Sequence, residues 1–275
     1  RTVRTDNTVM YATPNLSGFT GQLAYGFGEV AGNNTANRVL GGQLAYANGP
    51  LTIKLGHHNA KNPTATDTTR NTKITILGRS LVPDITVIDP RLLTTMPEWL
   101  NAATGLDALT HGIEAFVSLG HNQLTDHHAL RSVVMVTQNL VTTIERPQDM
   151  PARVLMAQAA LEAGLAFTNA ILGAAHAMSH QVGGLLDLPH GVINGVLLPH
   201  VVRFNAEADP APFATIAACL GIADKRAPEL ESALALADRL QELARQVGVP
   251  RGLAVLGVRE TDVPVLAHNA LQDAC

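Results

Sequence analysis

The chain has 275 residues, of which 46% are hydrophobic, enough for one large domain or two smaller ones with a buried core. The formal net charge of −4 gives no general reason to bind nucleic acid. The two cysteines are too few for a disulfide framework, so we expect a reducing compartment and a cytoplasmic location. No apolar run approaches the roughly 20 residues of a membrane-spanning helix, and the N-terminus lacks the apolar core of a signal peptide.

The composition changes along the chain. All three tyrosines lie within the first 46 residues, a region rich in Gly, Asn and Thr. Residues 1–72 hold six Lys or Arg and three Asp or Glu, a balance of +3, which leaves −7 for the remainder. The remainder is rich in Ala and Leu at helical spacing. Two parts of different architecture are therefore predicted, with the boundary between residues 72 and 73.

The first part alternates between polar and apolar residues, as half-buried strands do. Residues 8–12 and 19–25 flank a turn-forming segment, and residues 39–46 and 51–55 flank the sequence Asn-Gly-Pro at 48–50. Both arrangements predict antiparallel β-hairpins, about four strands in all.

Two long phrases in this part carry a resemblance. DNTVMYATPNLSGFTGQLAYGFGEVAGN (residues 6–33) and LAYANGPLTIKLGHHN (residues 44–59) resemble Gram-negative outer-membrane porins. On pattern alone an ordinary soluble β-meander is the alternative. About four strands are too few to form a pore of that class, so we assign this segment no transport function.

The second part begins with two short β-branched runs, residues 73–77 and 85–89, which predict strands leading into a helical region. Pro97 fits the first turn of a helix. Helices are then predicted over residues 98–118, 124–145, 150–169, 170–184, 191–205, 210–220, 228–247 and 260–272. The predicted fold is thus mixed: a short antiparallel β segment over residues 1–72, then a mainly α-helical domain over residues 73–275.

Three separated motifs of this domain contain residues that can bind a metal. In GLDALTHGIEAF (residues 105–116), Asp107 and His111 are four residues apart and share one helix face. In GAAHAMSHQVGG (residues 173–184), His176 and His180 are also one turn apart, and LPHG places His190 beside a glycine.

One carboxylate and several imidazoles suit Fe²⁺ or Zn²⁺, and no cysteine lies near enough in sequence to indicate a thiolate site. Spacing alone leaves His176 with His180 as an equally good two-histidine clamp. Ala177 stands where a metalloprotease HExxH motif needs glutamate, which excludes that class. Glu114 shares the face of Asp107 and His111, so it is a candidate partner of these ligands rather than a ligand itself.

These motifs, in order with VPDITVIDPRLL (residues 82–93) and LLPHVVRFN (residues 197–205), resemble iron-containing alcohol dehydrogenases from about residue 73 onward. The resemblance implies the helical C-terminal half of a dehydroquinate synthase-like fold. It also implies the metal ligands Asp107, His111, His176 and His190. His180 then lies beside nicotinamide and substrate as a catalytic residue instead of binding the metal.

The implied activity is oxidation of an alcohol to an aldehyde or ketone with NAD(P), in which the metal is a Lewis acid toward the alcohol oxygen. The expected cofactors are Fe²⁺ (or Zn²⁺) and NAD(P). The expected partners are a small alcohol or aldehyde substrate and, as a homo-oligomer, copies of the same chain. Neither nucleic acid nor a membrane is an expected partner.

The sequence departs from this family in its first part. No glycine-rich phosphate loop of the GGGS type is present, and a porin-like segment stands where the nucleotide-binding half is expected. The final LQDAC falls where the family continues for another helix or two. We therefore expect a truncated helical domain with impaired catalysis. The alternatives are a non-catalytic metal-binding domain, a porin fragment, or a relative of dehydroquinate synthases or glycerol dehydrogenases, which the DALTH phrase fits less well.

Overall fold

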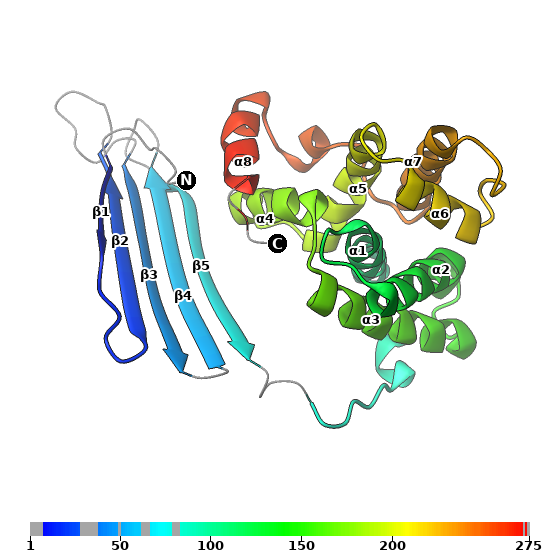
Figure 1. Ribbon diagram of the computed structural model, residues 1–275, viewed down its shortest axis with the longest axis horizontal. Coiled ribbons are helices and arrows are strands. Elements are labelled where there is room, and N and C mark those ends of the chain that lie inside the picture. Colours follow the sequence, from blue (N-terminus) through cyan, green and yellow to red (C-terminus); the bar gives the residue numbers. More distant parts are fainter. Residues whose placement is uncertain are drawn as a thin grey trace. The chain divides into compact units, whose positions relative to one another are not determined.

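The computed structural model describes residues 8–27, 38–48, 51–61, 67–78, 83–271 and 273. The chain divides into two compact units, residues 1–86 and 87–275. The first unit holds the strands and the second holds the helices (Figure 1). The expected mixed fold, a β segment followed by a mainly helical domain, is confirmed.

The first unit is a five-stranded antiparallel sheet in the order β1-β2-β3-β4-β5. Its strands are β1 (Thr8–Ala12), β2 (Phe19–Gly26), β3 (Val39–Asn48), β4 (Leu51–Lys61) and β5 (Asp67–Gly78). The β1–β2 turn is closed by a 2.7 Å hydrogen bond from the Gly18 backbone N–H to the Asn15 side chain. Gly18 there has φ of 96°, a conformation that glycine adopts without strain. Both predicted hairpins are present, with one more strand than expected.

The extra strand is β5, which crosses the predicted boundary between residues 72 and 73. The β-branched run at 73–77 is a strand, but it pairs with β4 (Ile53 opposite Ile76) instead of leading into the helices. The second run, 85–89, was wrongly predicted as a strand: it has no regular secondary structure and no strand partner in the described residues. Ile85 and Val87 are more than four-fifths exposed there, so their β propensity finds no sheet to join. The structural division falls at 86/87.

The second unit is mainly helical. It contains the helices α1 (Glu98–Val117), α2 (Gln123–Glu145), α3 (Met150–Ala170), α4 (Ala174–Leu186), α5 (His190–Ala206), α6 (Ala211–Cys219), α7 (Glu229–Gln246) and α8 (Val263–Ala270). Short 3₁₀ turns are η2 (Pro90–Leu93), η3 (Leu253–Leu256) and η4 (Glu260–Asp262). All the predicted helices are found close to their expected bounds, except that η4 forms the beginning of the last one.

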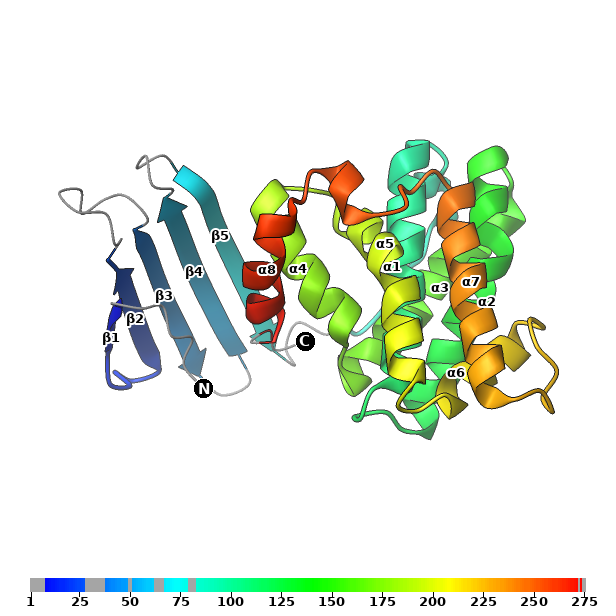
Figure 2. The same ribbon diagram turned by 90° about the horizontal axis from the view of Figure 1, so that it is seen from above.

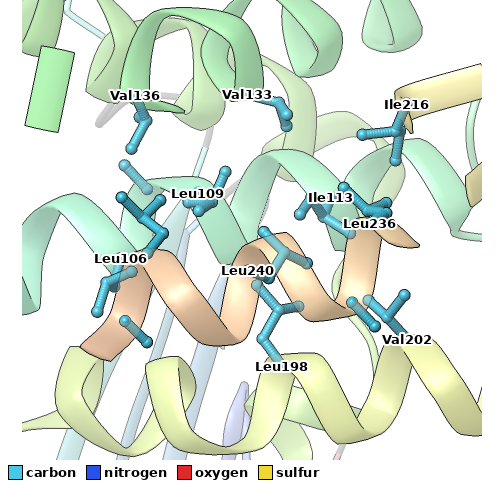
Figure 3. Close-up of a cluster of buried hydrophobic side chains, with 14 of the residues drawn as sticks. Leu106, Leu109, Ile113, Val133, Val136, Leu198, Val202, Ile216, Leu236 and Leu240 are labelled. Carbon is cyan, nitrogen blue, oxygen red and sulfur yellow. The ribbon is translucent and has the colours of Figure 1, made fainter. Parts of the chain in front are cut away.

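Helix α1 is the centre of this unit. It packs against α2, α3 and α5, and α5 in turn packs against α7 (Figure 2). Figure 3 shows the apolar side chains between these helices and α6: Leu106, Leu109, Ile113, Val133, Val136, Leu198, Val202, Ile216, Leu236 and Leu240. Because one face of α1 is fixed in this core, its polar residues are held in place beside α4 and α5.

Among the described residues, no single helix is both long and apolar enough to cross a membrane, although α3 and α4, bent by 103° at their junction, pass that test of length and composition as a pair.

Candidate metal centre

The candidate site lies where α1, α4 and α5 meet. Helix α1 carries Asp107 and His111, one turn apart, and the first turn of α4 carries His176. His190 is the first residue of α5, directly after Pro189. Helix α5 can begin this close to α1 because its second residue is Gly191, where a Cβ atom would lie 1.9 Å from the carbonyl oxygen of Ala103.

Asp107 faces all three histidines. Its Oδ1 lies 3.6 Å from His176 Nε2 and 3.5 Å from His190 Nε2, and its Oδ2 lies 3.6 Å from His111 Nδ1. Asp107, His111 and His176 each offer one atom within 4.8 Å of the others. Two donor atoms bound at about 2.1 Å to one tetrahedral ion lie roughly 3.4 Å apart, so this spacing and this set of oxygen and nitrogen donors fit a divalent cation.

His190, rather than His180, is the nearer neighbour of His176. The ring centroids of His176 and His190 are 5.2 Å apart, and those of His176 and His180 are 6.2 Å apart. His180 stacks on His190 at 5.2 Å, and its Nδ1 lies 3.1 Å from Asp273 Oδ2. His180 therefore borders the predicted ligand set. The roles of all five residues stay predictions.

Glu114 lies one turn beyond His111 on α1 and is almost fully buried. The sequence indicated it as a partner of Asp107 or His111, but its carboxylate contacts α4 instead. His176 Nδ1 lies 2.6 Å from Glu114 Oε2, and the backbone N–H of Ala175 donates to Oε1 at 2.6 Å. The carboxylate thus contacts the imidazole on the side opposite to Asp107.

The sequence reasoning missed Asn194, which is fully buried one turn after His190 on α5. Its Nδ2 lies 2.8 Å from Asp107 Oδ1, 3.2 Å from His176 Nε2 and 3.1 Å from His190 Nε2. Asn194 Oδ1 is buried with no hydrogen-bond partner in the described part of the chain. The i,i+4 spacing from His190 was the signal in the sequence that could have identified it.

The pKa values of the site are shifted in opposite directions. Burial lowers the pKa of His111 to about 4 and also lowers the pKa of His190, so both rings are neutral near pH 7. Burial also acts to lower the pKa of His176, but hydrogen bonds to Asp107 and Glu114 prevail and raise it to about 9. Burial opposes ionisation of Asp107, yet the surrounding histidines and Asn194 hold its pKa below the usual range. Neutral rings and an ionised carboxylate are the forms that bind metal.

A pocket of about 460 Å³ borders the site. Its lining includes Asp107 and His190, together with Trp99, Leu100 and Leu188. Polar groups thus meet apolar side chains at one opening, which is an arrangement that suits a small, partly apolar ligand.

The family model for the C-terminal part of the Fe-containing alcohol dehydrogenase family matches residues 101–275. The chain belongs to this family. The matched range contains every residue of the candidate metal centre, so the centre lies within the part shared with other Fe-containing alcohol dehydrogenases. A Gram-negative porin model matches residues 1–78, as the two phrases of the first part indicated.

Individual relatives agree. The 1,3-propanediol dehydrogenase of Klebsiella pneumoniae is 42% identical over 76% of this chain and 54% of its own length. The NAD-dependent methanol dehydrogenase of Bacillus methanolicus is 39% identical over 76% of this chain and 55% of its own length. A crystal structure of 1,3-propanediol oxidoreductase superposes with a TM-score of 0.71 at 39% identity, covering 79% of this chain and 56% of that one. The chain thus spans about half the length of these alcohol dehydrogenases.

Proposed function

We propose that Asp107, His111, His176 and His190 bind one divalent cation, Fe²⁺ or Zn²⁺, as the centre of an NAD(P)-dependent alcohol dehydrogenase activity on small alcohols and aldehydes. One observation carries this proposal: a single carboxylate lies within 3.6 Å of three imidazoles from three different helices. An isolated helix-surface pair would not bring donors from α4 and α5 to Asp107. The Fe-containing family favours Fe²⁺ as the ion.

The bound ion would supply Lewis acidity toward the oxygen of an alcohol or carbonyl substrate. The protein side chains hold the reacting groups in place. Glu114 buttresses His176, and Asn194 donates a hydrogen bond to the Asp107 carboxylate. The pocket beside Trp99 has room for a small alcohol. His180 borders this region, fixed through Nδ1 by Asp273, and is the candidate for orienting the substrate or relaying its proton.

Hydride transfer also needs an acceptor site for NAD(P). The 275 residues contain no glycine-rich phosphate loop, and the chain spans about half of its relatives. We propose that these residues alone bind the metal but catalyse poorly. The second candidate is a metal-binding domain without catalysis, which is favoured by the lack of a glycine-rich phosphate loop in these 275 residues. We also propose a cytoplasmic location, in keeping with the cysteine content, and assembly as a homo-oligomer.

The two candidates are separated by an assay of the Fe²⁺- or Zn²⁺-loaded chain with NAD⁺ or NADP⁺ and small primary alcohols, followed at the absorbance of the reduced nicotinamide. We expect little or no rate above the metal-free control. A robust metal-dependent rate that is lost in His180→Ala would contradict the proposed impairment and establish the complete activity. A chain that binds neither metal would refute both candidates.

A further inference from the structure

Glu114 connects one predicted metal ligand to the helix that carries it. Its carboxylate belongs to α1, and all four of its hydrogen-bond contacts in the described structure lie at the beginning of α4. They are the backbone N–H groups of Gly173 (3.1 Å), Ala175 (2.6 Å) and His176 (3.4 Å), and Nδ1 of the His176 ring (2.6 Å). Glu114 and His176 are both almost inaccessible to solvent.

The ring contact determines which nitrogen of His176 faces the site. A carboxylate only accepts hydrogen bonds, so His176 donates its Nδ1–H to Glu114. Nε2, on the other side of the ring, then faces Asp107 Oδ1 at 3.6 Å. An imidazole held in this way presents Nε2 to an ion in one orientation, and the carboxylate makes that nitrogen a stronger donor.

The backbone contacts determine where helix α4, which carries the His176 ring, starts. Helix α4 has no side-chain cap of its own, because its N-cap residue is Gly173. Glu114 supplies the missing acceptor from α1, and its negative charge is favourable at the positive end of the α4 dipole. A Cβ atom at Gly173 would lie 2.9 Å from Glu114 Oε1, so glycine at this position leaves room for the carboxylate.

We propose that Glu114 is a positioning residue for the metal centre, which fixes both the ring orientation of His176 and the start of α4 relative to α1. This inference rests on the proposed metal-binding function. Its consequence is that α1 supplies two ligands, Asp107 and His111, and also the group that aligns a third ligand on another helix.

The test is Co²⁺ binding to the full 275-residue chain, followed by titration and by the visible spectrum of the bound ion. Glu114→Gln keeps the size of the side chain but replaces one of the two carboxylate oxygens with an NH₂ group, so that only one oxygen remains to accept hydrogen bonds. We expect Co²⁺ affinity to fall about 10- to 100-fold, with altered visible bands because the His176 nitrogen is no longer held in one orientation. Glu114→Asp keeps the charge and should recover part of the affinity.

The matched control is Glu162→Gln. Glu162 is also a largely buried carboxylate that contacts Nδ1 of a histidine, His128, on the neighbouring helix. This pair is outside the metal centre, so the substitution should leave Co²⁺ affinity and spectrum unchanged, even if the chain melts at a lower temperature. A loss of Co²⁺ affinity that is caused by general destabilisation would appear in both Glu114→Gln and Glu162→Gln.

Gly173→Ala tests the same contact when Glu114 itself is intact, and it covers the case in which Glu114→Gln fails to fold. We expect weaker binding because the added methyl group displaces the carboxylate. Wild-type affinity and spectrum in folded Glu114→Gln, or in Gly173→Ala if that alone folds, would overturn the role of Glu114 and leave the metal site standing. A wild-type chain that binds no Co²⁺ would instead overturn the proposed function, and this inference with it.

Discussion

Asp107 is the residue on which the candidate centre depends. It is the one acidic member of the predicted ligand set, and its two oxygens face three imidazoles. Asn194 donates a hydrogen bond to one of these two oxygens, Oδ1. The charge of a partly buried, ionised carboxylate among imidazoles is balanced by a proton on one of the rings or by a bound cation. The raised pKa of His176 indicates that a proton on this ring balances the Asp107 carboxylate when no ion is bound.

This proton gives metal binding a definite pH dependence. His176 has its pKa raised to about 9, so without metal it is charged at neutral pH, while His111, with a pKa of about 4, is already neutral. A metal ion must displace the His176 proton. We therefore expect apparent Zn²⁺ affinity to rise about tenfold per pH unit between pH 7 and 8.5, with about one proton released per ion, and to level off above pH 9.

Isothermal titration calorimetry in buffers of different ionisation enthalpy measures both quantities. The free energy of unfolding of the metal-free chain depends on pH in the opposite sense. Because the pKa of His176 is raised in the folded state, its protonation stabilises the fold fully below pH 6.5, and this contribution disappears as the pH rises through 9. An affinity that stays flat from pH 7 to 8.5 would show that His176 is not protonated before metal binds, or does not bind it.

Single residues were predictable where their spacing was regular. Asp107 and His111 stand on one helix face by periodicity alone. The choice between His180 and His190 as partner of His176 could not be made from spacing, because it depends on where α5 starts in space. The sequence offered Glu114 as a neighbour of Asp107, whereas its carboxylate extends to α4, a contact between residues 62 positions apart.

At the scale of elements, the site depends on how closely α5 approaches α1. Asp187 ends α4 in the left-handed conformation, Pro189 follows, and Gly191 lies against the backbone of α1 at Ala103. Pro189 and Gly191 were visible in the sequence, but the contact with Ala103 was not, because residue 103 is an unremarkable alanine within a helix.

Substitution at Gly191 should separate the two helices. A Cβ atom there would lie 1.9 Å from a backbone oxygen, which cannot move aside as a flexible side chain can. We expect Gly191→Ala to lower the free energy of unfolding by about 1–3 kcal/mol and to weaken metal binding, since His190 moves with α5. Urea denaturation and Zn²⁺ titration measure the two effects.

Gly164→Ala is the matched control, because nothing lies within 4 Å of its Cβ position inside α3. It should raise the free energy of unfolding by about 0.5–1 kcal/mol through the better helix propensity of alanine and leave Zn²⁺ affinity unchanged. Equal stability of the two variants would contradict the close α1–α5 contact.

The bend between α3 and α4 was the least predictable element boundary. Residues 150–184 were expected to form two helices that join directly, without proline between them. The structure instead inserts Ile171, Leu172 and Gly173, with Ile171 at φ of 70°. A β-branched residue rarely adopts that conformation, so sequence preference argues against the bend. The position of Glu114 is a tertiary reason for it, because α4 must begin where the carboxylate can accept its N–H groups.

At the scale of the whole molecule, the chain consists of two compact units whose sequences match two unrelated families. The change in composition located their boundary only approximately. Residues 73–77 are β-branched like the preceding strands, and they also begin the part that resembles the alcohol dehydrogenases. Their sequence is therefore compatible with either the sheet or the helical domain. Pairing with β4 assigns them to the sheet, and only a structure can show such pairing.

From this division we predict that metal binding is confined to the second unit, residues 87–275. All the predicted ligands, Glu114 and Asn194 lie within residues 87–275, which have their own buried core. We expect a fragment of these residues to fold cooperatively and to bind Zn²⁺ with the affinity of the full chain. Thermal melting and Zn²⁺ titration of both proteins measure this. A fragment that is unfolded, or that binds much more weakly, would show that the helical unit needs the residues before it.

The most direct measurement of the central claim is the metal content of the chain and of two histidine variants on the same helix. His190 begins α5 beside Asp107, whereas His200 is exposed further along that helix. After reconstitution with Fe²⁺ or Zn²⁺ and removal of free ion, we expect about one ion per chain in the wild type and in His200→Ala, and far less in His190→Ala. A wild type without bound ion, or a His190→Ala variant that retains as much as His200→Ala, would contradict the metal centre.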